Sequence, residues 1–415
     1  MIPSFSLAGL FLLGVPISVA LALTAVAYIV ASGDAVLLDS LPQQLVSALD
    51  SYGLLALPLF ILLGEAMAAG GAGRRLVALA SSMVGPVRGG LAYVSLIANV
   101  MLAAILGSTV AQLTVMTRMV VPEMEKAGYP RQDAVAITAA GAMLAPVFPP
   151  SMMFILYGVI AQVPIGDLFV AGLVPGVLMA LSFFAVIALK ARRVPYPRTA
   201  PLAAEARRQA LIAALPSAAI PVFIVLAIAT GLATPTEAGG LAAILALVLG
   251  LFVHREMRWR DLGPMFTRAA MSSAVVLFLV AAAQLVGWVL AYANLPAQIG
   301  AMLAQAAGSP VTFMLLLNVI LIVIGTFLEP IPALLLVVPV TAPLAAQYGI
   351  DPVHLGLVIS INLSLGLLTP PVGAALFAAA SLSGLSPGRV AQGLMPYLAA
   401  AFAVLIFISI WPFLL

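Results

Sequence analysis

Long apolar runs follow one another along almost the whole chain, separated by short polar or basic loops. Runs of about 20 apolar residues are typical of helices that span a membrane. The pattern predicts nine spanning helices, at residues 5–30, 53–70, 133–160, 168–189, 211–230, 237–253, 269–292, 353–382 and 391–414. The first run has no basic leader before it, so we interpret it as a spanning helix and not as a cleaved signal.

Two other apolar stretches, residues 91–126 and 311–347, follow a different pattern. Each has two apolar arms of about 16 residues on either side of a small, polar turn. A helix of 16 residues reaches only ~24 Å, whereas the hydrocarbon core of a bilayer is ~30 Å thick. We therefore expect each stretch to be a re-entrant helical hairpin that enters and leaves on the same side.

The composition supports a membrane protein, because 64% of the residues are hydrophobic and only 7% are charged. Soluble domains carry about 25% charged residues. The predicted fold class is an all-α polytopic membrane protein, surrounded by membrane lipid. This excludes a nucleic-acid-binding domain and a β-barrel. The chain has no Walker motif, no HExxH motif and no cysteine, so we expect neither ATP hydrolysis nor an enzyme, and no cofactor.

The basic residues predict the orientation. All 17 Lys and Arg residues except Arg118 fall in loops that this threading places on one side. The opposite loops contain acidic residues and no Lys or Arg. Short cytoplasmic loops collect Lys and Arg, so we expect a cytoplasmic N-terminus and an extracytoplasmic C-terminus.

The chain also repeats itself. Asn-Val recurs at 99 and 318, Val-Val-Pro at 120 and 337, and two proline-containing motifs recur at an offset of 221. Each copy has three crossings and one hairpin, so the second copy is inverted. We place repeat 1 at about 40–190, a basic linker at 190–209 and repeat 2 at about 235–415. Inverted repeats suit alternating access in secondary transporters; the alternative is a duplicated scaffold without transport.

Two proline pairs, Pro149-Pro150 and Pro370-Pro371, fall near the middle of predicted spans. Proline removes a backbone donor and clashes with the preceding turn, so we expect two broken helices; the alternative is a plain kink. Free carbonyls at such breaks suit sodium, and half-helix N-termini favour an anion. The hairpin turns add backbone and hydroxyl groups to the candidate site at Gly107, Ser108, Thr109, Gly325 and Thr326.

Four polar residues at membrane depth, and Glu65 near the cytoplasmic surface, are further candidates. Asn99 and Asn318 are either interhelical fasteners or site residues, since a buried amide needs a hydrogen bond. Arg118 either binds a substrate carboxylate, reaches back to the interface or pairs with an acid. Glu329 either ligates a cation or caps the helix that follows it, and Glu65 is read as an interfacial charge.

Long ordered motifs resemble a known family. They are PLFILLGEAMAAGG (58–71), VVPEMEKAGYP (120–130), PPSMMFILYGVIAQVPIGDLFVAGLVPG (149–176), TPTEAGG (234–240) and GIDPVHLGLVISINLSLGLLTPPVG (349–373). They are similar to the large membrane subunit of the tripartite ATP-independent periplasmic (TRAP) transporters, the DctM-like permeases. The resemblance runs from about Gly14 to the C-terminus.

The resemblance implies an elevator-type, sodium-coupled importer in the bacterial inner membrane. It also implies a small DctQ-like membrane subunit and a periplasmic binding protein that delivers a carboxylate or other organic anion. By matched motif, sodium would be bound by Gly107, Ser108, Ala145, Pro146, Pro149, Gly325, Thr326, Glu329, Thr369, Pro370 and Gly373. Substrate would lie between the tips, near Asn99, Ser108, Thr109, Gln112, Arg118, Pro150, Ser151, Asn318, Thr326 and Pro371.

The first tip departs from the family pattern. Members commonly read SGSAVAD, whereas residues 106–112 here read LGSTVAQ, so the amide Gln112 replaces a carboxylate. Arg118 also falls where a small residue is usual. We expect a more anionic substrate or altered ion coupling. Two other functions stay open: a stand-alone anion transporter or exchanger that needs no binding protein, and a non-transporting membrane scaffold or enzyme.

Overall fold

The computed structural model describes residues 9–10, 13–34, 36–84, 87–198, 203–295, 298 and 307–414. Within these residues the chain is helical, with a single isolated β-bridge between Arg88 and Arg198. Eight of the described helices are long and apolar enough to cross a membrane. The polytopic all-α fold predicted from the sequence is therefore confirmed.

The first half of the chain forms several single helices, a hairpin, a broken helix and a last long helix. Its helices are α2 (Ile17–Ser32), α3 (Val36–Ser47), α4 (Ala56–Ala69), α5 (Ala72–Met83), α6 (Gly90–Leu106), α7 (Thr109–Met119), α8 (Val121–Lys126), α9 (Arg131–Ala142), α10 (Met152–Ile160) and α11 (Ile165–Arg193). The hairpin is α6 and α7 with its tip at 107–108, and the broken helix is α9 and α10 with 143–151 between them.

The second half repeats this order. Its helices are α12 (Ala204–Ala229), α13 (Pro235–Val248), α14 (Trp259–Tyr292), α16 (Pro310–Phe327), α17 (Pro330–Gln347), α18 (Pro352–Gly366), α19 (Ala374–Ser383) and α20 (Pro387–Ile410). Here the hairpin is α16 and α17, and the break between α18 and α19 covers 367–373.

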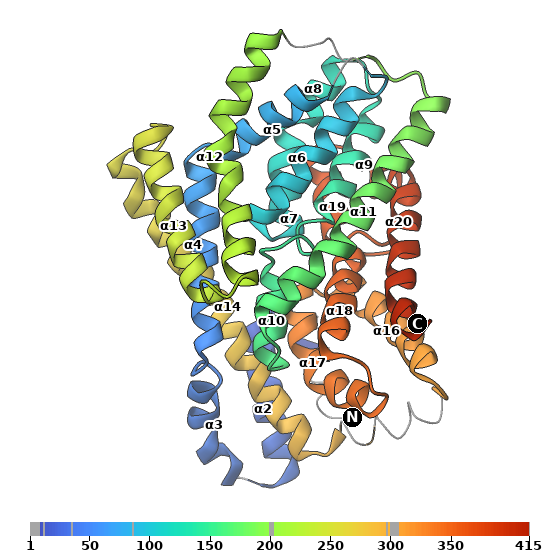
Figure 1. Ribbon diagram of the computed structural model, residues 1–415. Coiled ribbons are helices and arrows are strands. Elements are labelled where there is room, and N and C mark those ends of the chain that lie inside the picture. The colour runs from blue at the N-terminus through green and yellow to red at the C-terminus, as the bar shows by residue number, and fades with distance from the viewer. Residues whose placement is uncertain are drawn as a thin grey trace.

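One offset relates the two halves. Adding 221 to the bounds of α6 gives 311–327, which is α16 to within one residue, and the same offset places α11 on α20. The copies run in opposite directions: α11 ends near the top of Figure 1, whereas α20 ends near the bottom, beside the C-terminus. The offset also places α2 on α13, which extends the helical correspondence back to residue 17.

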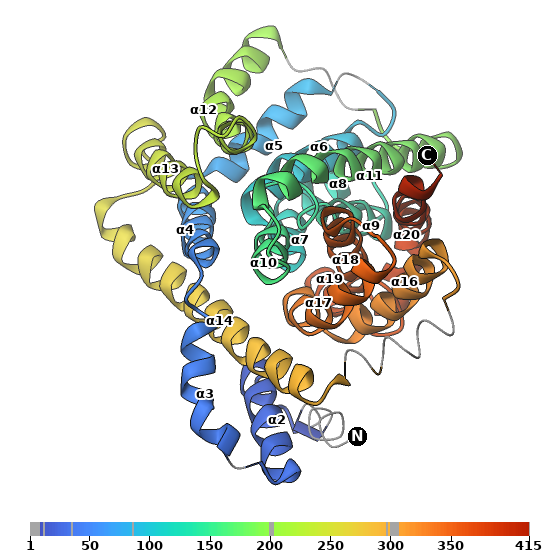
Figure 2. The ribbon, with the colours of Figure 1, turned by 60° about the horizontal axis from the view of Figure 1, so that its bottom comes forward.

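The helices form two groups. The helices α2, α3, α4, α5, α12, α13 and α14 pack on one another in a row at one side, and both hairpins and both broken helices form a bundle with α11 and α20 (Figure 2). The groups meet where α5 packs on α6 and where α14 packs on α17. Here the row is called the scaffold and the second group the bundle.

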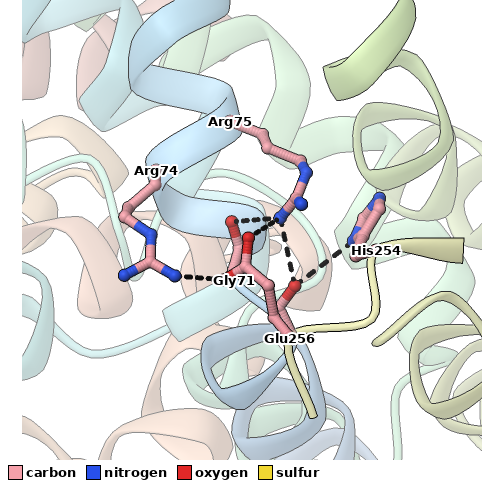
Figure 3. A network of polar contacts seen from close by, with 6 residues as sticks. Gly71, Arg74, Arg75, His254 and Glu256 are labelled. Atoms are coloured by element: carbon pink, nitrogen blue, oxygen red, sulfur yellow. Dashed lines mark hydrogen bonds and ion pairs between the residues drawn. The ribbon is translucent and has the colours of Figure 1, made fainter. Parts of the chain in front are cut away.

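A polar network fixes one end of the scaffold (Figure 3). The guanidinium groups of Arg74 and Arg75, in the first turn of α5, both pair with the Glu256 carboxylate before α14, Arg75 at 2.6 Å. Gly71 has φ +71°, and a Cβ atom there would collide with this carboxylate. His254 Nδ1 lies 3.2 Å from the carbonyl oxygen of Gly70. The network therefore joins the α4–α5 turn of the first half to the loop before α14 in the second.

The same contacts set the charge state of the network. Burial raises the pKa of the Glu256 carboxyl, but hydrogen bonds and charge from Arg74 and Arg75 outweigh burial and lower it below the ordinary value. Burial, with the nearby charge of Arg75, lowers the pKa of the His254 imidazole. The network thus holds two cations and one anion at neutral pH, with the histidine uncharged.

The predicted bounds needed two corrections. The first span, predicted at 5–30, is α2 at Ile17–Ser32 in the described residues, and residues 1–8 lie outside them. The helices α3 and α5 were not predicted. Both are short and amphipathic, so a search for long apolar runs passes over them.

Candidate functional site

The first hairpin tip is a tight turn between α6 and α7. Gly107 ends α6 with φ +58°, a left-handed conformation that glycine adopts readily. Ser108 precedes α7, and its hydroxyl accepts a hydrogen bond from the Ala111 amide at 3.5 Å. The carbonyl end of one half-helix and the amide end of another are thus adjacent at this tip.

The first helix break lies against this tip. A Cβ atom at Gly107 would be 3.7 Å from the Met152 amide nitrogen and 4.0 Å from the Pro150 carbonyl oxygen. Within the break, the Ser151 hydroxyl donates to the Pro146 carbonyl at 2.5 Å. Ala145 and Pro149 are also buried in it. Backbone of the break therefore faces backbone of the tip, as the sequence motifs implied.

The second hairpin tip and second break are even closer. A Cβ atom at Gly366 would lie 2.5 Å from the Gly325 carbonyl carbon, so only glycines allow these backbones to meet. The Gly373 amide donates to the Thr326 carbonyl at 3.0 Å, and the Thr369 hydroxyl donates to the Leu365 carbonyl at 2.7 Å. Pro370 and Pro371 are exposed, unlike Pro149 and Pro150, which are buried.

One cavity of about 110 Å³ joins the two halves. Its lining includes Gly107, Ser108, Thr109 and Pro146 from the first half and Glu329, Pro330 and Leu367 from the second. Both tips and both breaks therefore contribute to a single space. The repeated motifs suggested that the tips and breaks of the two halves meet, but neither motif alone could show it.

The polar groups at this cavity suit ions. The N-terminal ends of α7 and α17 begin at its lining residues, and helix N-termini attract anions. The buried Thr109 hydroxyl oxygen has no hydrogen-bond partner. Among the described residues, no three His, Cys, Asp or Glu side chains form a metal-binding group, so a cation here would depend on carbonyl and hydroxyl oxygens with Glu329.

Buried amides join the arms of the first hairpin. Gln112 Nε2 on α7 donates to the Asn99 carbonyl at 2.8 Å and to Asn99 Oδ1 at 2.9 Å, and lies 3.3 Å from the Gly141 carbonyl of α9. Asn99 and Gln112 are both fully buried. Both amides act as fasteners here, and their contact with substrate stays a prediction.

The second hairpin has a corresponding amide pair with a different donor. Asn362 Nδ2 on α18 donates to Asn318 Oδ1 at 2.6 Å and to the Asn318 carbonyl at 3.0 Å. Asn318 Nδ2 in turn donates to the Ser409 hydroxyl of α20 at 2.9 Å. The offset of 221 relates Asn362 to Gly141, so the amide that donates to the hairpin asparagine comes from α7 in the first half and from α18 in the second.

Three charged candidates lie in different surroundings. Arg118 is exposed in the last turn of α7, ten residues or ~15 Å along the helix from Ser108. Glu329 is exposed, lines the cavity and precedes α17 without a side-chain cap hydrogen bond. Glu65 pairs with Arg268 of α14 at 2.9 Å, which agrees with its reading as a structural charge.

The sequence reasoning missed three residues of this region. Asn362, Ser409 and Gly366 complete the second hairpin's contacts. Asn362 stands in the ISINLSLG segment, but its counterpart at 141 is glycine, so the internal repeat gave no signal for it. Gly366 is one glycine of 34 in the chain, and only the packing singles it out.

Comparison with known proteins identifies the family. The model described as "Tripartite ATP-independent periplasmic transporter, DctM component" matches residues 5–414. The chain belongs to this family. It is therefore the large, multi-pass permease component of a TRAP transporter, and the family implies a small membrane subunit and a periplasmic binding protein.

Several relatives are similar over most of the chain. The Escherichia coli (strain K12) 2,3-diketo-L-gulonate TRAP transporter large permease protein YiaN is 35% identical over 364 residues, 88% of this chain and 86% of the relative. The Vibrio cholerae sialic acid TRAP transporter large permease protein SiaM is 30% identical over 98% of this chain and 95% of its own. The isethionate TRAP transporter permease protein DctMQ of Oleidesulfovibrio alaskensis is 35% identical over 98% of this chain but only 64% of the relative.

A solved structure is similar in fold. The crystal structure of the Alcanivorax borkumensis YdaH transporter, described as having an unusual topology, matches with a TM-score of 0.68. The match covers 92% of this chain and 90% of that chain at 17% identity. At this identity the likeness concerns the fold alone.

Proposed function

We propose that this TRAP permease imports an organic anion of carboxylate type together with sodium ions. The observation that carries the proposal is the single cavity lined by both hairpin tips and both helix breaks. Carbonyl ends and amide ends of half-helices are adjacent there, so one space offers ligands to a cation and hydrogen-bond donors to an anion.

Each half supplies one proposed sodium site. The first lies between Gly107 and Ser108 at the tip and the break residues Ala145, Pro146 and Pro149. The second lies between the tip and break of the second half, formed by Gly325, Thr326, Glu329, Thr369, Pro370 and Gly373. Support comes from the packing, because Gly107 lies against the first break and Gly325 against Gly366 at the end of α18.

The substrate is proposed to bind between the two tips. Ser108 and Thr109 line the cavity, and Pro150, Ser151, Thr326 and Pro371 belong to the adjacent breaks and tip. Arg118 is proposed as an electrostatic guide on the outer part of α7, since an exposed guanidinium attracts a carboxylate over several ångströms. The substrates of the relatives suggest the class: a sugar acid, sialic acid or isethionate.

The proposed mechanism is an elevator. The bundle, with both hairpins and breaks, moves against the scaffold, and the inverted repeats give inward-facing and outward-facing states of comparable energy. The repeats, predicted at about 40–190 and 235–415, extend back to α2 when α13 is taken as its counterpart, and the linker predicted at 190–209 lies between α11 and α12. The polar network at Glu256 supports a fixed scaffold, because it ties helices of both halves together.

The protein is proposed to lie in a bacterial inner membrane with its basic loops in the cytoplasm. The N-terminal end of α12 and the helices α5 and α8 lie together at the top of Figure 1, and the C-terminus lies at the bottom. The basic linker precedes α12, so this arrangement supports a periplasmic C-terminus. The N-terminal residues, predicted to be cytoplasmic, lie outside the described residues.

The proposal is tested by reconstituting the permease with its small subunit in proteoliposomes and supplying the binding protein outside. We expect labelled organic anion to accumulate only with an inward sodium gradient and with the binding protein present. Uptake that needs no binding protein would favour the stand-alone transporter. The absence of any sodium-dependent uptake over a panel of sugar acids, dicarboxylates and sulfonates would refute the proposal.

A further inference from the structure

A long apolar fissure separates the two arms of the second hairpin. It has a volume of about 280 Å³ and lies between α16 and α17. Its α16 wall runs from Phe313 through Leu317 to Ile324, which is three helical turns or ~16 Å. The space is therefore elongated along the helices, a shape that fits an extended chain better than a compact molecule.

Among the described residues that line it, none offers a free polar group. Of these, only Thr341 has a polar side chain, and its hydroxyl donates to the Val337 carbonyl at 2.9 Å. An unpaired polar ligand would lose its hydrogen bonds on entering, and apolar cavities of even 150 Å³ exclude water and accept hydrocarbons. The occupant that fits this lining is a hydrocarbon.

The fissure reaches the surface of the protein at membrane depth. Both α16 and α17 are long and apolar enough to span a membrane. Ile320 lines the fissure and is 38% exposed, and Val323 and Phe327 on the same helix are 55% and 64% exposed. The hairpin lies within the bilayer, where exposed apolar side chains meet acyl chains, so we expect lipid at the rim of the fissure.

A side-chain contact joins the two arms of the first hairpin, and the second hairpin lacks its equivalent among the described residues. Gln112 links α7 directly to Asn99 of α6. In the second hairpin, Asn318 of α16 instead pairs with Asn362 of α18. Among the described residues, no side-chain hydrogen bond joins α16 to α17, and Tyr348 stacks on Phe313 only at their open end, with ring centroids 4.7 Å apart.

We propose that this fissure binds one acyl chain of a membrane phospholipid between the arms of the second hairpin. The acyl chain braces α17, whose first residue lines the ion cavity. The binding is independent of sodium and of transported substrate.

The test uses a matched pair of variants. Val337→Phe adds a ring inside the fissure, where Val337 is 8% exposed, and Val323→Phe makes the same change on the exposed face of α16. Each permease, with its small subunit, is delipidated in a short-chain detergent and given palmitoyl-oleoyl phosphatidylglycerol, and bound lipid is counted by native mass spectrometry. We expect the wild type and Val323→Phe to retain one phospholipid more than Val337→Phe, and at least a tenfold weaker lipid affinity in the last.

Equal lipid counts and affinities in all three proteins would overturn the proposal. A wild-type measurement guards against misfolding of Val337→Phe: phosphatidylglycerol brominated in mid-chain should place bromine density between α16 and α17 in an electron cryomicroscopy map. A map with an empty fissure, or occupancy by free oleic acid but not by phospholipid, would also overturn it. Neither readout requires uptake, so failure of sodium-coupled transport would leave this result intact.

Discussion

The contact between Gly325 and Gly366 allows a sharp test of the second sodium site. Replacing Gly366 by alanine places a methyl group 2.5 Å from the Gly325 carbonyl carbon. Ordinary contacts of this kind begin near 3.4 Å, so the tip and α18 must separate by about 0.9 Å. The atom it meets belongs to the backbone, and an alanine Cβ has no alternative rotamer, so the side chain cannot turn away from the clash.

The expected cost is large for a single methyl group. Overpacking of this kind costs about 1–3 kcal/mol, and the displacement separates the carbonyl groups that form the proposed site. If the cost falls on the sodium-bound state, it raises the half-maximal sodium concentration by about 5- to 150-fold. Because the first half contains its own tip and break, some sodium activation should remain.

The assay is sodium titration of substrate uptake in proteoliposomes that contain the small subunit. Gly263→Ala is the control: an alanine Cβ at this exposed position in α14 has no neighbour within 4 Å. We expect wild-type sodium activation from Gly263→Ala and a strong rightward shift from Gly366→Ala. A folded Gly366→Ala permease with wild-type sodium activation would refute the placement of a site between Gly325 and α18.

Other predictions concern the breaks and the charges. Replacing Pro370-Pro371 by Ala-Ala should favour continuous helix and weaken sodium dependence; unchanged sodium activation counts against carbonyl ligands at this break. Gln112→Ala should lower thermal stability by about 1–3 kcal/mol, since buried carbonyls lose their donor; an unchanged melting temperature would contradict the fastener role. The pKa of the Glu256 carboxyl is lowered in the folded protein, so its ion pairs stabilise the fold above pH 4.5 and this stabilisation is lost as the pH falls further. Glu256→Gln should remove this dependence of the melting temperature on pH. Arg118→Ala should raise the KM for an anionic substrate at low salt more than at high salt, and equal KM values would remove Arg118 from substrate attraction.

The sequence predicted much of the fold for a physical reason. Inside a bilayer the backbone N–H and C=O groups of a spanning segment have no water to bond, and a helix is the main structure that pairs them. Apolar runs therefore located most spans and both hairpins, and the proline pairs located both breaks. The amphipathic helices α3 and α5 were not predicted, because their mixture of polar and apolar residues resembles that of loops. The internal repeat, with three crossings in each copy, also predicted the inversion.

The candidate site was less predictable from the residues alone. The tips and breaks were identified, yet their convergence on one cavity is a long-range property that no local pattern encodes. The amides illustrate the limit: Asn99 and Asn318 stand at matching positions, but their donors are Gln112 and Asn362, on helices that do not correspond. The two halves thus share their backbone arrangement, whereas the side chain that donates the equivalent hydrogen bond comes from a different helix in each half.

The central claim is that the two hairpin tips meet at one cavity, where sodium and the anion bind. The chain has no cysteine, so the double variant Val110→Cys and Ile331→Cys, which changes no proposed ligand, tests the meeting directly with a short mercury or bifunctional thiol cross-linker, because both positions line the cavity. The account predicts an efficient cross-link that stops uptake and that sodium with substrate slows. Failure to cross-link two reactive thiols, or cross-linking that leaves uptake intact, would contradict it.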